Sequence, residues 1–168
     1  MSAGKKWYAI YTRSRFEKRT YGLLTDRGQE AYLPLVDSWR VWSDRKKRIE
    51  IPLLSSYLFV YADPEDYQTY LDILNTPGVV RFIGFEGKPA PIPEQQIDAL
   101  KRISKEGVHM ECLEETPPPG TPVTVQSGPL KGLQGEVVHS SKGRQVVIRL
   151  DILDKCITVN IPLIQLGI

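Results

Sequence analysis

The sequence is poor in cysteine and histidine, and it has no long apolar run. Two cysteines among 168 residues, Cys112 and Cys156, make neither a disulfide framework nor a metal-binding pattern. The N-terminus has no apolar stretch of the signal-peptide kind, and no run of roughly 20 apolar residues could cross a bilayer. We therefore expect buried thiols, no metal site, no membrane partner and a soluble, cytoplasmic protein.

The sequence also lacks the short motifs that accompany catalysis. It contains no G-x-x-x-x-G-K-[ST] phosphate loop, no G-x-G-x-x-G after the first apolar run and no G-x-S-x-G. Its two histidines, His109 and His139, have no Cys or His at ligand spacing. The acids Asp63, Glu65 and Asp66 fit a helix start better than acid–base chemistry. We expect a binding protein without catalytic residues or cofactors; a nucleic-acid-modifying enzyme would need a metal or nucleophile site.

Positive charge is concentrated in the first third of the chain. Residues 1–48 hold 12 Lys and Arg against 5 Asp and Glu, whereas residues 49–110 hold 5 against 9. This asymmetry suits a polyanion, most simply nucleic acid, although chance clustering on a solvated surface gives the same counts. One basic set flanks the first apolar run, and a second lies at a predicted hairpin tip, where it serves either phosphate contacts or solubility. The sets are Lys5, Lys6, Arg13, Arg15, Lys18 and Arg19, and Arg45, Lys46, Lys47 and Arg48.

Strand-like runs and helical periods alternate through the first two thirds of the chain. Apolar and β-branched residues predict strands at 7–11, 32–36, 57–61 and 79–83, and a hairpin around 39–51. Pro34 places the second of these strands at an edge or an end. Together with three intervening helices, this order favours a mainly antiparallel α/β sandwich, so the fold class is α+β.

The three predicted helices carry start and stop signals. Ser14 and Glu17 have the spacing of a capping box, and Gly28 supplies a C-terminal stop. The run Asp63-Pro64-Glu65-Asp66 predicts the start of the second helix, with an N-cap carboxylate followed by proline. The run Pro93-Glu94 opens the third helix, which Gly107 ends.

The pattern of the last third predicts a separate, all-β domain. Short apolar runs at 123–125, 136–138, 145–150 and 157–161 are separated by glycine-containing turns, which suggests a small barrel. A semi-rigid spacer containing Pro117-Pro118-Pro119 precedes them. We therefore expect a domain at residues 1–110, a linker at 111–120 and a β domain at 121–168.

Aromatic residues are the most informative candidates for a binding site. Tyr57, Phe59 and Tyr61 fall on one face of their predicted strand. This face is either core, if helices cover both sides of the sheet, or an apolar surface stripe that marks a partner site. Tyr11 and Phe82, on other strands, could extend the stripe.

The same strand partly fits an RNA-binding motif. Tyr57, Phe59 and Val60 match the RRM pattern K/R-G-F/Y-G/A-F-V-x-F/Y. The residues that do not match it are Ser55, Ser56, Leu58 and Ala62. This leaves a free-standing RNA-binding protein, of RRM-like or ribosomal type, as an alternative function.

Several segments, taken in order, resemble the NusG family of bacterial transcription factors. They are Trp7-Tyr8-Ala9-Ile10-Tyr11 with Phe16-Glu17-Lys18, Tyr57-Leu58-Phe59-Val60 before an acidic helix start, Thr76-Pro77-Gly78-Val79-Val80-Arg81-Phe82-Ile83-Gly84 with Lys88-Pro89 and Ile92-Pro93-Glu94, and a KOW-like run from Val123 through Gly128-Pro129-Leu130-Lys131-Gly132 to Val138. The resemblance spans nearly the whole chain. It implies an SH3-like KOW barrel for the last domain. One departure is Ser55-Ser56, where the family usually has Pro followed by Gly or a similar turn residue.

The resemblance implies a function in transcription elongation and antitermination. Factors of this family bind the clamp helices of RNA polymerase with the first domain, bridge to the opposite lobe, hold the clamp closed and reduce pausing. By position in the motifs, the residues are Tyr11, Tyr57, Phe59 and Phe82 for the clamp, Gln68 and Thr69 for the opposite lobe, and Arg13, Arg15, Lys18 and Arg19 for DNA.

The resemblance also implies further partners and a subtype. The KOW domain would recruit Rho or a ribosomal protein, and the basic residues would meet non-template DNA or nascent RNA. The continuation Tyr11-Thr12-Arg13, the segment from Trp42 to Lys47 and the Asp63-Pro64-Glu65 junction favour a specialised paralogue of the RfaH or capsular-polysaccharide-operon type, acting as a monomer.

Overall fold

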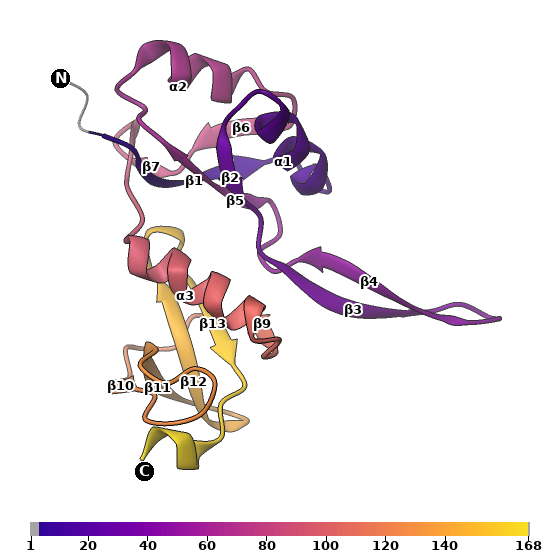
Figure 1. The fold of residues 1–168 in the computed structure, drawn as a ribbon, viewed down its shortest axis with the longest axis vertical. Coiled ribbons are helices and arrows are strands. Elements are labelled where there is room, and N and C mark those ends of the chain that lie inside the picture. The colour runs from indigo at the N-terminus through magenta and orange to yellow at the C-terminus, as the bar shows by residue number, and fades with distance from the viewer. Residues whose placement is uncertain (1–3, 168) are drawn as a thin grey trace. The chain divides into compact units, whose positions relative to one another are not determined.

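The computed structural model describes residues 4–167, which form two compact units. One unit comprises Met1–Pro34 and Leu54–Glu94, and the other comprises Leu35–Leu53 and Gln95–Ile168. Figure 1 labels most of their elements. The structure therefore groups the third helix with the C-terminal strands, and the predicted boundary after residue 110 falls inside a strand of the second unit. The division at 1–110, 111–120 and 121–168 stays a prediction.

The first unit is built on a four-stranded antiparallel sheet. Its strands, in the order β2-β5-β1-β6, are β2 (Glu30–Tyr32), β5 (Tyr57–Ala62), β1 (Lys6–Thr12) and β6 (Val79–Phe82). The predicted α+β class and antiparallel pairing are confirmed. The strand predicted at 32–36 is wrong, because Pro34 lies in the gap between β2 and the next strand, β3 (Leu35–Val41). Proline has no N–H for a ladder bond and interrupts the pairing there.

Helix α1 (Glu17–Asp26) begins without the predicted capping box. Its N-cap is Phe16, which makes no side-chain cap bond. The buried carboxylate of Glu17 instead accepts the backbone N–H of Ser56 at 2.8 Å. Ser56 has a positive φ of 67°, so this bond holds the strained turn that leads into β5. Gly28, with φ of 81°, follows the helix end as predicted.

Helix α2 (Tyr67–Leu74) begins later than its acidic start signal predicts. Asp63 Oδ1 accepts the N–H of Glu65 at 3.1 Å, and the N–H of Asp66 bonds to the Asp63 carbonyl. Residues 63–66 therefore form a turn that precedes the helix, whose N-cap position is Asp66. The same donor–acceptor chemistry that favours a helix start also closes an isolated turn.

One face of this sheet packs against α2. Ile10 pairs with Phe82 across β1 and β6, so the two side chains share that face. The Phe82 ring stacks on Tyr70 of α2 with centroids 5.3 Å apart, and it meets Tyr8 edge-on at 6.2 Å. Two short strands, β7 (Gly84–Phe85) and β8 (Lys88–Pro89), pair as a small hairpin after β6.

The second unit contains a long hairpin of β3 (Leu35–Val41) and β4 (Lys46–Pro52). The strands pair from Leu35 opposite Pro52 to Val41 opposite Lys46, and together they form a two-stranded sheet. The predicted hairpin is present, and its strands are longer than the alternating apolar residues alone indicate.

The rest of the second unit combines one helix with a five-stranded antiparallel sheet. Helix α3 (Glu94–Lys105) buries an apolar stripe of Ile97, Leu100 and Ile103. The sheet, in the order β10-β11-β12-β13-β9, consists of β10 (Thr121–Thr124), β11 (Gln134–Ser140), β12 (Gly143–Leu150), β13 (Lys155–Val159) and β9 (Met110–Cys112). The prediction that the last third of the chain folds into β-strands is confirmed. β9 precedes the prolines and has too few residues to give a sequence signal.

Two short 3-10 helices, η1 (Asp151–Leu153) and η2 (Leu163–Leu166), complete the second unit. Across residues 4–167, no helix is long and apolar enough to span a membrane.

Candidate binding surfaces

An aromatic face covers the side of the first sheet opposite the Ile10–Phe82 face. The register places Tyr11 opposite Tyr57, Ala9 opposite Phe59 and Trp7 opposite Tyr61, and directly opposed residues share a face. Tyr32 of β2 lies opposite Phe59 on the same face, and their rings stack with centroids 6.3 Å apart. The solvent exposure of these residues therefore decides whether the stripe belongs to the core or forms a binding surface.

Solvent reaches both ends of this aromatic face and not its middle, since Tyr61 at the far end is half-buried too. Phe59 is fully buried, so it is a core residue beneath the surface. Tyr11 and Tyr57 are half-buried, with ring centroids 5.5 Å apart in an edge-to-face arrangement. The exposed Arg81 guanidinium lies 5.8 Å from the centroid of the Tyr11 ring. Tyr11, Tyr57 and Arg81 thus form a compact patch, which we call the tyrosine patch.

The strand register explains why Arg81 belongs to the tyrosine patch, although the sequence analysis did not select this residue. Arg81 lies directly opposite Tyr11, so both side chains point to the same face of the sheet. The sequence does indicate that Arg81 and Phe82, as neighbours in one strand, point to opposite faces of the sheet. It does not indicate which of them shares a face with Tyr11, because that depends on the order of the strands.

Phe82 does not extend the aromatic stripe. It pairs with Ile10 on the opposite face, is 8% exposed and is enclosed by Tyr8 and Tyr70. The expectation that it continues the stripe is wrong, because consecutive residues of a strand point to opposite faces and Arg81 occupies the other one. Phe82 supports the tyrosine patch only indirectly, through the sheet.

Four predicted DNA-facing cations lie next to this patch along the chain. Arg13, Arg15, Lys18 and Arg19 occupy the connection from β1 to α1 and the first turns of α1, and all four are exposed. Arg15 has a positive φ of 66°, and the Arg19 guanidinium lies 5.7 Å from the centroid of the Phe16 ring. The connection is anchored where the Arg13 N–H bonds to the carbonyl of Gly78 at 2.9 Å.

Gln68 and Thr69 lie on the first turn of α2, and each bonds to a carboxylate close to it in the sequence. Gln68 Nε2 donates to Asp72 Oδ1 at 2.8 Å, and Thr69 Oγ1 donates to Asp66 Oδ2 at 2.7 Å. Gln68 is exposed and Thr69 is half-buried. Polar side chains with such local partners are ordered at the surface and can exchange these bonds for those of a partner.

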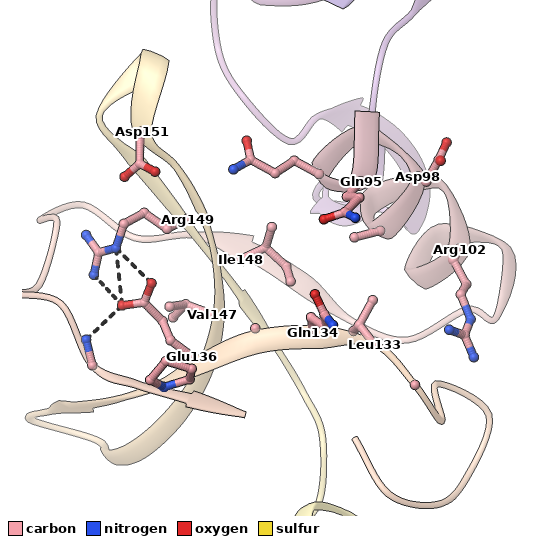
Figure 2. Close-up of a pocket in the computed structure, with 16 residues that line it drawn as sticks. Gln95, Asp98, Arg102, Leu133, Gln134, Glu136, Val147, Ile148, Arg149 and Asp151 are labelled. Carbon is pink, nitrogen blue, oxygen red and sulfur yellow. Dashed lines mark hydrogen bonds and ion pairs between the residues drawn. The ribbon is translucent and has the colours of Figure 1, made fainter. Parts of the chain in front are cut away.

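The second unit holds a cavity of about 630 Å³ between α3 and the five-stranded sheet. Figure 2 shows Gln95, Asp98 and Arg102 on the helix side and Glu136, Ile148 and Arg149 on the sheet side. Arg102 donates to the carbonyls of Pro129 and Lys131, which ties α3 to the loop before β11. Among residues 4–167, no group of three or more His, Cys, Asp or Glu is arranged to hold a metal ion.

An ion pair at the edge of this cavity fixes the proline-rich segment to the sheet. The Arg149 guanidinium approaches the Glu136 carboxylate at 2.8 to 3.2 Å, and both side chains are less than one fifth exposed. Glu136 also accepts the N–H of Gly120, and Arg149 donates to the carbonyl of Pro118. The hydrogen bonds from Arg149 lower the pKa of Glu136 below its ordinary value. These contacts are structural and bring no nucleophile together with a base.

Comparisons with known proteins agree on one family. The model of the family described as transcription termination factor NusG matches residues 5–101. The NusG of Rickettsia bellii, a transcription termination/antitermination protein, is 26% identical over 96% of this chain and 88% of its own length. That of Staphylococcus epidermidis is 29% identical over 79% and 78%. A solved structure of Thermotoga maritima NusG has a TM-score of 0.54 at 20% identity and covers 92% of both chains.

Proposed function

Because the chain belongs to the NusG family of non-enzymatic transcription termination and antitermination factors, we propose that it binds bacterial RNA polymerase and suppresses pausing and termination. The tyrosine patch binds the clamp helices of the polymerase. The observation that carries this proposal is the pairing of two half-buried tyrosines on a rigid sheet face, with an arginine beside them.

The tyrosine patch has the composition of a protein-binding hot spot. Tyrosine and arginine are enriched among the residues whose truncation weakens protein interfaces most. Tyr11 and Tyr57 lie opposite each other on two paired strands, so little side-chain freedom is lost on binding. Phe59 is fully buried on the same face, next to the patch along β5, and Phe82 is buried on the opposite face of the sheet. Both stabilise the sheet that carries the patch.

Two further sets of residues complete the proposed contacts with the transcription complex. Gln68 and Thr69, on α2, reach the opposite lobe of the polymerase. Arg13, Arg15, Lys18 and Arg19 contact non-template DNA or nascent RNA near the clamp; their closeness along the chain to Tyr11 supports this placement. Contacts between such cations and phosphates are insensitive to base sequence and weaken with salt.

The activity follows from differential binding. A factor that bridges the two lobes of the polymerase binds the closed clamp more tightly than the open one. A tenfold preference shifts the clamp equilibrium by about 1.4 kcal/mol toward the closed state. The closed state resists pausing, so elongation continues through sites where it would otherwise stop.

The KOW-like β domain recruits a second partner, Rho or a ribosomal protein. We propose further that the chain is a specialised paralogue of the RfaH or capsular-polysaccharide-operon type, which works as a monomer in the cytoplasm. Such an operon-specific paralogue reduces pausing on the templates of its own operon and not on others. In-vitro transcription on paired templates with and without the native leader of its operon tests this; equal effects on both would assign the chain to the general type.

The central proposal is tested by binding of the full chain to purified core RNA polymerase at physiological salt. Tyr57→Ala and Tyr11→Ala should each weaken binding by roughly 30-fold, which corresponds to about 2 kcal/mol for a hot-spot aromatic. Tyr21→Ala, on α1 and 36% exposed, is the matched control and should bind as the parent chain does.

Binding to RNA alone separates the proposal from its alternative. If the parent chain binds naked RNA strongly and polymerase not at all, it is a free-standing RNA-binding protein and the proposal fails. If Tyr57→Ala, Tyr11→Ala and Tyr21→Ala all bind polymerase equally, polymerase binding stands but the tyrosine patch is not its site.

A further inference from the structure

The β3–β4 hairpin exposes large apolar side chains that no fold requirement explains. Trp39 is 66% exposed, Val41 is 70% exposed and Trp42 is 44% exposed. They occur within four consecutive residues, and such exposed clusters on a folded protein mark a partner site. The hairpin also carries five cations: Arg40, Arg45, Lys46, Lys47 and Arg48.

The register divides these side chains between two different faces. Arg40 lies opposite Lys47, and the alternation continued past the strand ends adds Trp42 and Arg45 to the same face. We call this set of four residues the Trp42 face.

The opposite face is less positive. It carries Trp39 opposite Arg48 and Val41 opposite Lys46, together with Asp37 opposite Glu50. Arg48 forms an ion pair with Asp37. The two tryptophans of the hairpin therefore sit in different electrostatic surroundings.

The Trp42 face combines a ring with cations in a fixed geometry. The Arg45 guanidinium lies 4.9 Å from the centroid of the Trp42 ring, and the Trp42 N–H bonds to the Arg45 carbonyl at 2.7 Å to close the tip. Arg45 lies over the indole, and Trp42 is 44% exposed, so ring surface remains available for a second planar group. Arg40 and Lys47 lie one cross-strand pair further along the hairpin, at a distance of two residues, or about 7 Å.

We propose that the Trp42 face binds single-stranded nucleic acid. One base stacks on the exposed part of the Trp42 ring, and Arg40 and Lys47 contact the neighbouring phosphates. Stacking on an aromatic ring beside a cationic groove is the general way in which proteins hold single strands without sequence preference. The residues of this site are different from those of the tyrosine patch and from Arg13, Arg15, Lys18 and Arg19.

Charge and geometry favour this ligand over the alternatives. The face holds three cations and no carboxylate of its own; the nearest carboxylate along the sequence is Asp44, in the turn between the two strands. A protein partner would need a dense acidic surface to match it, whereas a nucleic acid presents one phosphate at every nucleotide. A duplex keeps its bases stacked on one another, so a tryptophan gains a stacking partner only from unpaired bases.

The test measures binding of the full chain to labelled oligonucleotides of roughly 12 nucleotides, within the usual site size for single strands. The arms are mixed-sequence single-stranded DNA, the RNA of the same sequence and the matching duplex. Trp42→Ala should weaken single-strand binding by about 5-fold to about 150-fold. Trp39→Ala is the matched control, because it removes the same side chain from the more exposed, less positive face and should have little effect.

The salt dependence tests the phosphate contacts separately. Replacing Arg40 and Lys47 together by glutamine should reduce the slope of log affinity against log salt by about 1.4, or about 0.7 for each cation. Both tryptophans are exposed, so thermal unfolding should be unchanged in all these variants.

Three outcomes would overturn the proposal. Equal losses in Trp42→Ala and Trp39→Ala would mean that the face is not specific. Equal binding of duplex and single strand, insensitive to Trp42→Ala, would mean charge attraction alone. No binding to any oligonucleotide would leave the hairpin as a protein contact. Polymerase binding by the same variants reports on the proposed function independently, since it should be retained whichever result is found.

Discussion

The ion pair between Glu136 and Arg149 gives the sharpest prediction about stability. Glu136→Gln keeps the shape of the side chain and an acceptor for the Gly120 N–H, but it removes the negative charge that three close approaches of the Arg149 guanidinium share. A hydrogen bond to a charged group contributes about 1.5–3 kcal/mol. Because both side chains are less than one fifth exposed, solvent screens little of this. We expect Glu136→Gln to destabilise the second unit by about 1.5–3 kcal/mol.

The assay exploits the distribution of aromatic residues. No Trp, Tyr or Phe follows Phe85 in the sequence, so fluorescence does not report on the five-stranded sheet. Amide hydrogen exchange measured by NMR does. The amides of β12 and β13 should exchange roughly 10-fold to 150-fold faster in Glu136→Gln, whereas those of β1 and β5 in the first unit serve as the internal control and should not change.

A double-mutant cycle with Arg149→Met isolates the pair. The coupling energy between the two sites should be about 1.5–3 kcal/mol. A coupling below about 0.5 kcal/mol would refute the reasoning, because that is the value of an ordinary exposed ion pair. In that case the proline-rich segment would be held by its backbone contacts alone.

Three further predictions concern pH, the core and a tight turn. The pKa of Glu136 in the folded state lies below its ordinary value of 4.5, so the pair stabilises the second unit above about pH 4.5 and this contribution is lost as the pH falls below it; amide protection in β12 should follow, and Glu136→Gln should abolish that part of the pH dependence. Phe59→Ala should destabilise the first unit by about 3–5 kcal/mol, as measured by denaturant unfolding, whereas an effect below about 1 kcal/mol would mean that the residue is not core. Gly78→Ala should cost more than about 1 kcal/mol by the same measurement, since Gly78 has φ of 94° and the new Cβ would collide with Thr20 Oγ1; an unchanged midpoint would contradict this.

Local patterns in the sequence determined most of the secondary structure. The alternation at 57–61, the helical period after Glu94 and the glycine stops at Gly28 and Gly107 all describe real elements, because each depends on neighbours within a few residues. The same patterns failed where one local signal has two solutions. Glu17 had the spacing of a cap yet bonds to Ser56, 39 residues away.

The candidate site could be predicted only in part, and Phe82 and Arg81 show why. The sequence marks both as members of one short strand, but it does not say which neighbour that strand has or on which face each side chain meets it. Pairing β6 with β1 puts Arg81 beside Tyr11 and buries Phe82 behind the sheet. Predicting the Tyr57–Phe59–Tyr61 stripe required only the period of two, whereas separating the buried Phe59 from the half-buried Tyr57 required the tertiary structure.

The sequence by itself therefore determined the class of fold, the order of its elements and the family, since these follow from periodicity and from motifs that are continuous along the chain. The tertiary structure alone decided which aromatic side chains reach solvent, which partner Glu17 takes and that Met110–Cys112 joins the C-terminal sheet. The physical reason is that burial and long-range hydrogen bonds depend on segments brought together by folding, and no local rule records which segments meet.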